Sequence, residues 1–218
     1  VVSLRRWVKG RSNGGGSNVN SVICWRTVHR YETAVAGGEV CSESEGLEPQ
    51  TLLGVDYERI KAVGPDRAAA EWLLRCGAKV RFQGFDRWHH DYNGLPTGPL
   101  GRYKIQGIDA TESCIMYRGF DHLDGLKHVE EIKLSKCIYI EDACLERLSS
   151  IENLQESLYM MEVVSCGNVT DKGIVALHKL KNLEYLFLSD LPGIKDKQMT
   201  VGRLQTALPR LDVELDLE

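Results

Sequence analysis

The sequence predicts the α/β fold class: a small, mostly helical N-terminal domain followed by a short leucine-rich-repeat solenoid with repeats of the Cys type. Two observations predict this architecture. An Ala-rich amphipathic segment lies between Pro65 and Gly77. Downstream of it, apolar residues at one repeated position stand 26, 29, 25 and 25 residues apart, a period typical of such repeats: Ile108, Leu134, Val163, Leu188 and Val213.

Each predicted repeat carries the same spacing of apolar residues, L-x-x-L-x-x-L-x-L-x-x-C in its fullest form. We expect a short strand to point two of them into the core, the Cys to lie at the next bend, and a helix to return the chain. The phrase V-T-D-K-G-I at 169–174 is typical of the segment after the Cys. The copies are Leu126, Val129, Ile132, Leu134 and Cys137; Leu158, Met161, Val163 and Cys166; Leu183, Leu186, Leu188 and Leu191; and a truncated Leu208, Leu211, Val213 and Leu215.

The N-terminal domain is expected at residues 55–104, with a short helical pattern at 55–63. Pro65 and Asp66 predict a helix start, because proline loses no hydrogen bond in the first turn and a carboxylate suits the helix dipole. Gly77 suits the left-handed cap that ends this helix. Residues 79–82 alternate polar and apolar side chains and predict a strand. The repeat domain follows at 105–218, divided at 105–130, 131–159, 160–191 and 192–218.

Residues 1–54 differ in composition from the rest of the chain. From Val1 to Tyr31 there are six basic residues and no acidic one, which is typical of an organelle transit peptide. A disordered basic tail is the alternative. Residues 32–54 are acidic and small and predict a linker or disorder.

The overall composition excludes several classes of protein. The chain of 218 residues is 43% hydrophobic and 27% charged, with a net charge of -4, so it lacks the basic surplus of nucleic-acid-binding proteins. No apolar run approaches the roughly 20 residues that span a bilayer, which leaves at most a peripheral association with a membrane. The seven cysteines are scattered and odd in number, which indicates a reducing compartment. We expect Cys137 and Cys166 to be core residues.

No catalytic constellation is recognisable. The phosphate-binding pattern G-x-x-x-x-G-K-[ST] is absent from the sequence. His89 and His90 are adjacent, so they cannot easily face one metal ion, and we expect a solvated loop there. The sequence therefore predicts no enzyme and no catalytic or cofactor-binding residue.

The strands of the repeats should present a second face to solvent, because residues that flank the inward positions point the other way. Most of these flanking residues are polar. Four are not, and they lie on neighbouring strands, where aromatic and Met side chains often anchor a protein partner. The alternative is that they pack against the N-terminal domain or the chain end. These four candidates are Met160, Val164, Tyr185 and Phe187.

Several phrases of residues 55–218 carry a family resemblance. They include V-D-Y-E-R-I at 55–60, E-W-L-L-R-C-G-A at 71–78, D-Y-N-G-L-P-T-G-P-L at 91–100 and I-D-A-T-E-S-C-I-M at 108–116. This part of the chain resembles the family of mitochondrial ATP synthase subunit s, also called coupling factor B. One departure is the family's Cys-x-Cys pair, because Ser135 stands here two residues before Cys137.

The resemblance implies a function. It implies a non-enzymatic coupling factor at the matrix side of the mitochondrial inner membrane, peripheral to the ATP synthase membrane sector. Such a factor regulates proton conduction and blocks a proton leak, so that ATP synthesis is supported. The alternatives are a leucine-rich-repeat assembly factor for the membrane arm of respiratory complex I, or a ubiquitin-ligase substrate receptor.

The resemblance also implies a magnesium ion held by a Gly and a Thr, which match Gly77 and Thr111. Gly77 can offer only its carbonyl, at a helix end where carbonyls lack partners. We place Thr111 at the bend position that Cys fills in the next two repeats. Magnesium prefers oxygen ligands and keeps several waters, so two neutral ligands predict weak binding. The alternative is a plain cap glycine and a bend threonine.

Overall fold

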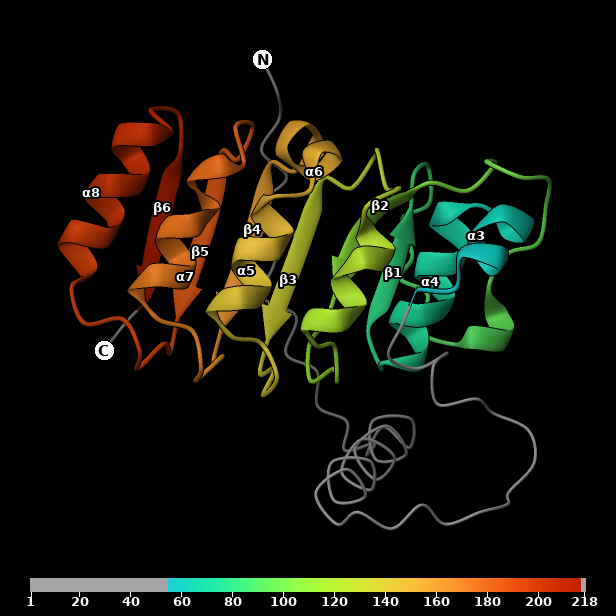
Figure 1. Cartoon of the computed structure of the whole chain (residues 1–218), viewed down its shortest axis with the longest axis horizontal. Helices are drawn as coiled ribbons and strands as arrows, with labels where there is room; N and C mark the ends of the chain where they lie inside the picture. The colour runs from blue at the N-terminus through green and yellow to red at the C-terminus, as the bar shows by residue number, and fades with distance from the viewer. Residues whose placement is uncertain (1–54, 217–218) are drawn as a thin grey trace, which may run out of the picture.

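The computed structural model describes residues 55–216. The expected transit-like and linker segments at 1–54 lie outside the described residues. The described part is a mixed α/β fold with one six-stranded sheet, and its strands follow one another in chain order across the sheet (Figure 1). The strands are β1 (Lys79–Phe82), β2 (Ile105–Asp109), β3 (Glu131–Ser135), β4 (Met160–Val164), β5 (Tyr185–Ser189) and β6 (Asp212–Asp216).

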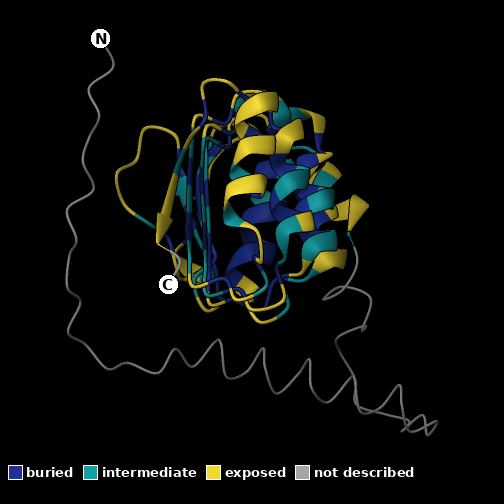
Figure 2. Cartoon of the chain, turned by 90° about the vertical axis from the view of Figure 1, so that its left-hand side faces the viewer, coloured by how far each residue is buried: buried dark blue, intermediate teal, exposed yellow. Residues whose placement is uncertain are grey.

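Strand β1 is antiparallel to β2, and every later neighbour is parallel. The helices lie on one face of this sheet and leave the other face without a helical layer (Figure 2). They are α3 (Tyr57–Val63), α4 (Pro65–Arg75), α5 (Asp142–Ser149), α6 (Glu152–Ser157), α7 (Asp171–Ala176) and α8 (Lys197–Ala207), with 3-10 turns η1 (Tyr92–Gly94), η2 (Tyr117–Leu123) and η3 (Leu177–Lys179).

The N-terminal elements form as their sequence predicts. Helix α4 begins with Pro65 and ends before Gly77, whose φ of +84° is the left-handed conformation that glycine adopts without strain. The Ala78 amide donates to the Leu73 carbonyl and closes the helix end. Strand β1 has the predicted bounds, and the helical pattern at 55–63 is α3.

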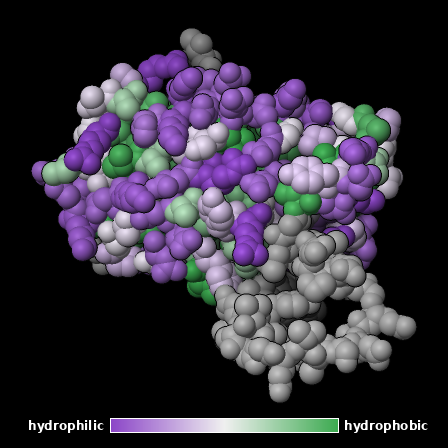
Figure 3. All heavy atoms as spheres, in the orientation of Figure 1, coloured by the Kyte–Doolittle hydropathy of each residue, from purple (hydrophilic) through white to green (hydrophobic). Residues whose placement is uncertain are grey.

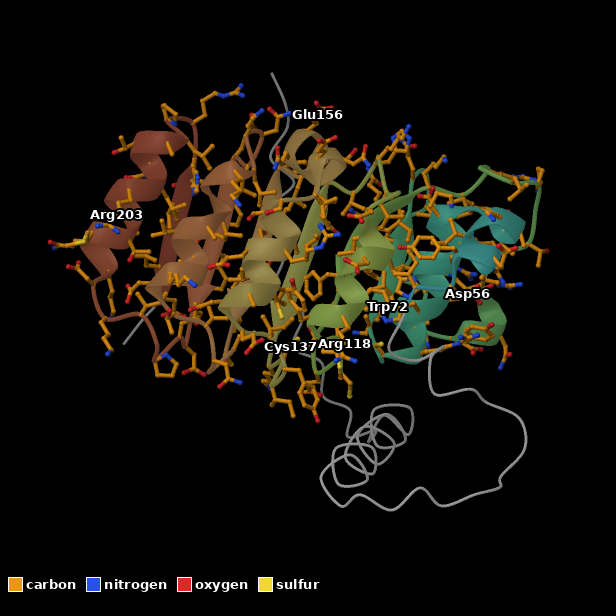
Figure 4. All side chains as sticks on the ribbon, in the orientation of Figure 1. Asp56, Trp72, Arg118, Cys137, Glu156 and Arg203 are labelled. Carbon is orange, nitrogen blue, oxygen red and sulfur yellow. The ribbon has the colours of Figure 1, made fainter. Side chains whose placement is uncertain are left out.

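The core lies between the sheet and the helices. Side chains of β4 and β5 alternate strictly between the buried core side and the half-buried opposite side, as a pleated strand with one covered face requires. Cys137, labelled in Figure 4 where β3 ends, has no exposed surface, and neither has Cys166. The prediction that these two cysteines are core residues is confirmed.

Strands β2, β3, β4 and β5 are each followed by a turn of the same kind. A non-glycine residue takes a left-handed φ of 49° to 56° at four places, and its amide bonds the next strand, as Lys136 does to the Val164 carbonyl. By this alignment Glu112 matches Lys136, so Ser113, and not Thr111, stands after β2 where Cys137 stands after β3. The placement of Thr111 at the Cys position was wrong, because the left-handed residue follows the end of β2 two residues later than it follows the end of β3. The four residues are Glu112, Lys136, Ser165 and Asp190.

The strand register also corrects the repeat series at both ends. Ile108 pairs with Ile132 rather than with Leu134. At the other end Val213 pairs with Leu186, and Leu215 pairs with Leu188. The physical reason is that connections of unequal length join the strands, so a uniform residue count drifts while backbone hydrogen bonds fix the true register.

Neighbouring helices are tied together by aspartates at their first turns. Asp142 accepts hydrogen bonds from the amide and hydroxyl of Thr170, at 2.8 and 2.6 Å. Asp171 accepts from the Lys195 amide and the Thr200 hydroxyl, at 2.9 and 2.8 Å. The helix-covered face is largely hydrophilic (Figure 3). Within residues 55–216, no helix combines the length and apolar character needed to cross a lipid bilayer.

Candidate functional site

The face of the sheet without helices is the candidate site, and we call it the open face. Its residues alternate with the core residues along each strand, and strand pairing aligns them in rows across the sheet. From β1 to β6 they are Lys79 and Arg81; Gly107 and Asp109; Glu131, Lys133 and Ser135; Met160, Glu162 and Val164; Tyr185, Phe187 and Ser189; and Asp212, Glu214 and Asp216.

On β1–β3, which we call the closed half, charges are paired and covered. Lys79 lies 3.5 Å from Asp109, and Arg81 lies 3.0 Å from Glu131. Trp88 stands over this half: the Arg81 guanidinium lies 5.4 Å from its ring centre. A Cβ added at Gly107 would come within 2.9 Å of the Trp88 ring and 2.6 Å of the Glu131 carboxylate. The space above Gly107 is therefore already filled.

The closed half holds its carboxylate at an electrostatic cost. Burial raises the pKa of Glu131, and the Arg81 charge opposes that rise without cancelling it. The Nε atom of Arg81 is buried and has no hydrogen-bond partner. The Arg81–Glu131 ion pair is thus largely shielded from solvent.

On β4–β6, which we call the aromatic half, the four residues proposed from the sequence are brought together. Met160 pairs with Tyr185, Phe187 lies in the next row, and Val164 lies in the row after that. All four are half-buried. The structure thus places these four side chains near one another on two neighbouring strands. Ser135 on β3, which alternation also assigns to the open face, is buried.

The Tyr185 hydroxyl is held by the next strand. It donates a hydrogen bond to the Glu214 carboxylate at 2.6 Å. Burial and then this bond raise the pKa of Tyr185 to about 12. Although β6 pairs with β5 along its whole length, the side chains of Met160, Val164 and Phe187 stay half-buried.

Strand β6, at the edge of the aromatic half, carries three carboxylates on the open face, which we call the carboxylate row. Asp212, Glu214 and Asp216 stand opposite Tyr185, Phe187 and Ser189. Among residues 55–216, no Lys or Arg forms an ion pair with any of the three. Sequence reasoning missed Asp216, although the alternation D-V-E-L-D at 212–216 was the signal.

Gly77 and Thr111 come to the same end of β1 and β2. Lys79 pairs antiparallel with Asp109, and continuing this register by two residues sets Gly77 opposite Thr111. The Thr111 hydroxyl donates to Asp109 at 2.5 Å. Because this bond uses the hydroxyl proton, the lone pairs of the Thr111 oxygen remain available to a cation.

The donors at this place suit a hard cation weakly. A carbonyl and a hydroxyl are oxygen ligands of the kind magnesium takes, and Asp109 orients the hydroxyl as a supporting residue. The Asp109 carboxylate itself is already shared with Lys79. No group of three or more His, Cys, Asp or Glu side chains in the described range is arranged to hold a metal ion.

The adjacent histidines separate. His90 is exposed, as expected for a solvated loop, but His89 is buried, which corrects the prediction for that residue. The His89 backbone bridges to Val80 of β1, and its ring packs edge-on to Phe82. Its Nε2 atom has no hydrogen-bond partner. His89 thus anchors the segment that carries Trp88.

Comparison with known proteins identifies close relatives, although no family model matches the chain. It is 66% identical to "ATP synthase subunit s, mitochondrial" of Bos taurus over 164 residues, which are 75% of this chain and 82% of the relative. The protein of the same name from Homo sapiens is 64% identical over the same shares. A more distant relative, "Distal membrane arm assembly component 2" of Drosophila melanogaster, is 25% identical over 162 residues, 72% of this chain and 55% of that protein. The chain belongs to the family of mitochondrial ATP synthase subunit s.

Proposed function

We propose that this chain is a non-enzymatic coupling factor of mitochondrial ATP synthase. It acts at the matrix side of the inner membrane, peripheral to the membrane sector, and it supports ATP synthesis by limiting a proton leak. The observation that carries this proposal is the 62–66% identity, over three quarters of the chain, to relatives named as subunit s of that enzyme.

We further propose that the parallel strands and helices from residue 105 onward are leucine-rich repeats of the Cys type, with residues 55–104 as the N-terminal domain. The recurring left-handed turn and the chain-order parallel strands support the repeat assignment. In this arrangement the sheet is the natural docking face, because successive strands present a continuous surface.

The partner is proposed to bind the aromatic half through Met160, Val164, Tyr185 and Phe187. These side chains are half-buried in the isolated chain, so a partner that covers them removes apolar surface from water. The closed half offers no comparable patch, since its charges are paired and Trp88 covers it.

The test is co-purification from mitochondria of cells expressing Tyr185→Glu/Phe187→Glu. We expect a folded protein that no longer co-purifies with ATP synthase. The matched control is Met199→Glu, which places a charge on an apolar side chain of helix α8 that is already 52% exposed, and which should leave co-purification intact. Unchanged melting together with unchanged co-purification would exclude this half of the open face.

A second candidate function rests on the distant relative. The 25% identity to "Distal membrane arm assembly component 2" favours, more weakly, a role in assembling another complex. The same purification separates the two: ATP synthase subunits should be enriched with the tagged chain. Enrichment of the complex I membrane arm instead would replace the first proposal with the second.

The magnesium site is proposed at the Gly77 carbonyl and the Thr111 hydroxyl, and it is weak. Isothermal titration should show magnesium uptake only at millimolar concentration, and Thr111→Val should abolish it. Thr206→Val, which removes an exposed hydroxyl on α8, is the matched control. No uptake by the parent protein, or the same uptake by both variants, would remove these two residues as ligands.

A further inference from the structure

Strand β6 ends the sheet with an open edge. Among the described residues it is bonded to β5 alone, because the strand order ends with β6. Figure 2 looks onto this end of the sheet, where an exposed strand lies in front. The outer backbone groups of such a strand are free to pair with another extended chain.

The core side of β6 is incompletely covered. The inward residues of β5, Leu186 and Leu188, are 0% and 1% exposed. Their counterparts on β6 are Val213, which is half-buried, and Leu215, which is 40% exposed. The edge therefore has apolar side chains that an added strand would shield on the helix side.

The opposite side of β6 is acidic. Asp212, Glu214 and Asp216 point to the open face at every second position, and no cation of the described residues is paired with them. Two copies of this chain joined edge to edge would bring six such carboxylates together, and like charges opposite one another destabilise a strand pair. The charge pattern thus disfavours a second copy and favours a basic occupant.

We propose that β6 is a docking edge for an extended segment of a partner protein in which basic and apolar side chains alternate. The segment adds a seventh strand by main-chain hydrogen bonds. Its basic side chains lie beside Asp212, Glu214 and Asp216, and its apolar side chains cover Val213 and Leu215. This inference does not depend on the proposed coupling function, since it uses the edge and not the identity of the complex.

The test measures binding of a synthetic nine-residue peptide of alternating Lys and Val to the full chain by fluorescence anisotropy. This sequence reads the same in both directions, so the result does not depend on whether the added strand is parallel or antiparallel. A peptide of alternating Glu and Val, and a Lys/Val peptide N-methylated at every second amide, are the comparison probes. We expect the Lys/Val peptide to bind at least tenfold more tightly than either of them.

The decisive variant reverses the edge charge: Asp212→Lys/Glu214→Lys/Asp216→Lys. Because three lysines still repel a second copy, this variant should stay monomeric in sedimentation, and its preference should switch to the Glu/Val peptide. The matched control, Glu58→Lys/Glu152→Lys/Glu156→Lys, makes the same change in net charge on exposed helix positions and should keep the original preference.

Each other outcome overturns the proposal. Equal binding of the N-methylated peptide would show charge attraction without strand addition. A switch of preference in the control variant would show a response to net charge alone. Parent protein that sediments as a dimer would assign the edge to a second copy. If the Lys/Val peptide did not bind at millimolar concentration, the three carboxylates of β6 would serve only to prevent other strands from pairing with this edge.

Discussion

The two halves of the open face belong to one sheet but differ in the side chains that they present. In the closed half, cations and carboxylates of neighbouring strands neutralise one another, and Trp88 fills the space over Gly107. In the aromatic half, Tyr185 and Phe187 stand beside three carboxylates that have no cation partner within the described range. The rows are continuous across both halves, so the halves differ in their strand side chains and in the Trp88 segment that covers one of them.

This difference shows which half of the open face has surface available to a partner. A confined ion pair contributes little net stability once its desolvation is counted, yet removing one member leaves a buried charge. The closed half is therefore sensitive to single substitutions and poor at binding. Strand β6 of the aromatic half should tolerate substitutions in the free chain, because its three carboxylates are exposed to solvent.

The largest effect is expected for Arg81→Met, which leaves the Glu131 carboxylate confined without its cation. The side chains are only 22% and 14% exposed, so we expect a loss of roughly 2 kcal/mol in the free energy of unfolding. Urea denaturation at neutral pH measures it. The double variant Arg81→Met/Glu131→Leu should lose less than Arg81→Met alone.

Glu214→Gln is the matching substitution in the aromatic half, and we expect it to change stability by less than about 0.5 kcal/mol. If Arg81→Met and Glu214→Gln had equal effects, the two halves would not differ in confinement, and the comparison would fail.

A smaller effect is expected for Gly107→Val in the closed half. The new side chain must displace the Trp88 ring and the Glu131 carboxylate, which costs about 1–2 kcal/mol as overpacking. The control is Ser189→Val on β5, in a strand position of the aromatic half, which should stay within about 0.5 kcal/mol of the parent protein. Thermal unfolding of both variants checks this. A Gly107→Val protein as stable as its control would show that the Trp88 ring can move away from position 107 at little cost.

The sequence predicts local elements well and their relative placement less well. Helix α4 and strand β1 follow from Pro65, Gly77 and alternation, because capping and pleating are local physics. The register does not, since it depends on the lengths of connections: Thr111 and Val213 were both assigned to the wrong repeat position.

The candidate site divides in the same way. Alternation was enough to find Met160 and Tyr185. Side chains alternate between the two faces of a strand, so an error of two residues in the register leaves each side chain on its correct face. The role of Trp88 could not be predicted, because it comes from a turn-rich segment with no periodicity. His89 was misplaced for the same reason: a bridge to Val80, absent from any local pattern, buries it.

The dependence of stability on pH should differ between the halves. At acid pH we expect it to depend on His89, which anchors the Trp88 segment over the closed half. Burial, and next the Arg87 charge, lower the pKa of His89 below its ordinary value of 6.5. The unfolded chain therefore binds a proton at His89 more readily than the folded chain does. The contribution of neutral His89 to the free energy of unfolding is complete above about pH 6.5 and is lost as the pH falls through the folded-state pKa.

His89→Phe keeps an aromatic ring against Phe82 and removes the titration. We expect the decline in unfolding free energy between pH 7.5 and 5.5 to be shallower in this variant than in the parent protein. His90→Phe, at the exposed neighbouring position, should leave the decline as it is. If the unfolding free energies of the parent and His89→Phe proteins depended identically on pH, protonation of His89 would not destabilise the Trp88 segment.

The smallest effect belongs to the aromatic half and appears on the alkaline side. Tyr185 donates a single hydrogen bond to Glu214, so Tyr185→Phe should cost only about 0.5 kcal/mol at neutral pH. Since its folded-state pKa is raised to about 12 from 10, the contribution is present below pH 10 and is lost as the pH rises toward 12. Ultraviolet titration of the phenols should show a transition near pH 12 that Tyr185→Phe removes and that Glu214→Gln moves toward 10. Asp109→Asn, a carboxylate of the closed half, should leave this transition in place. If Tyr185 instead ionised near 10 in the parent protein, the carboxylate row would not act on the aromatic patch, and the two parts of the aromatic half would be electrostatically independent.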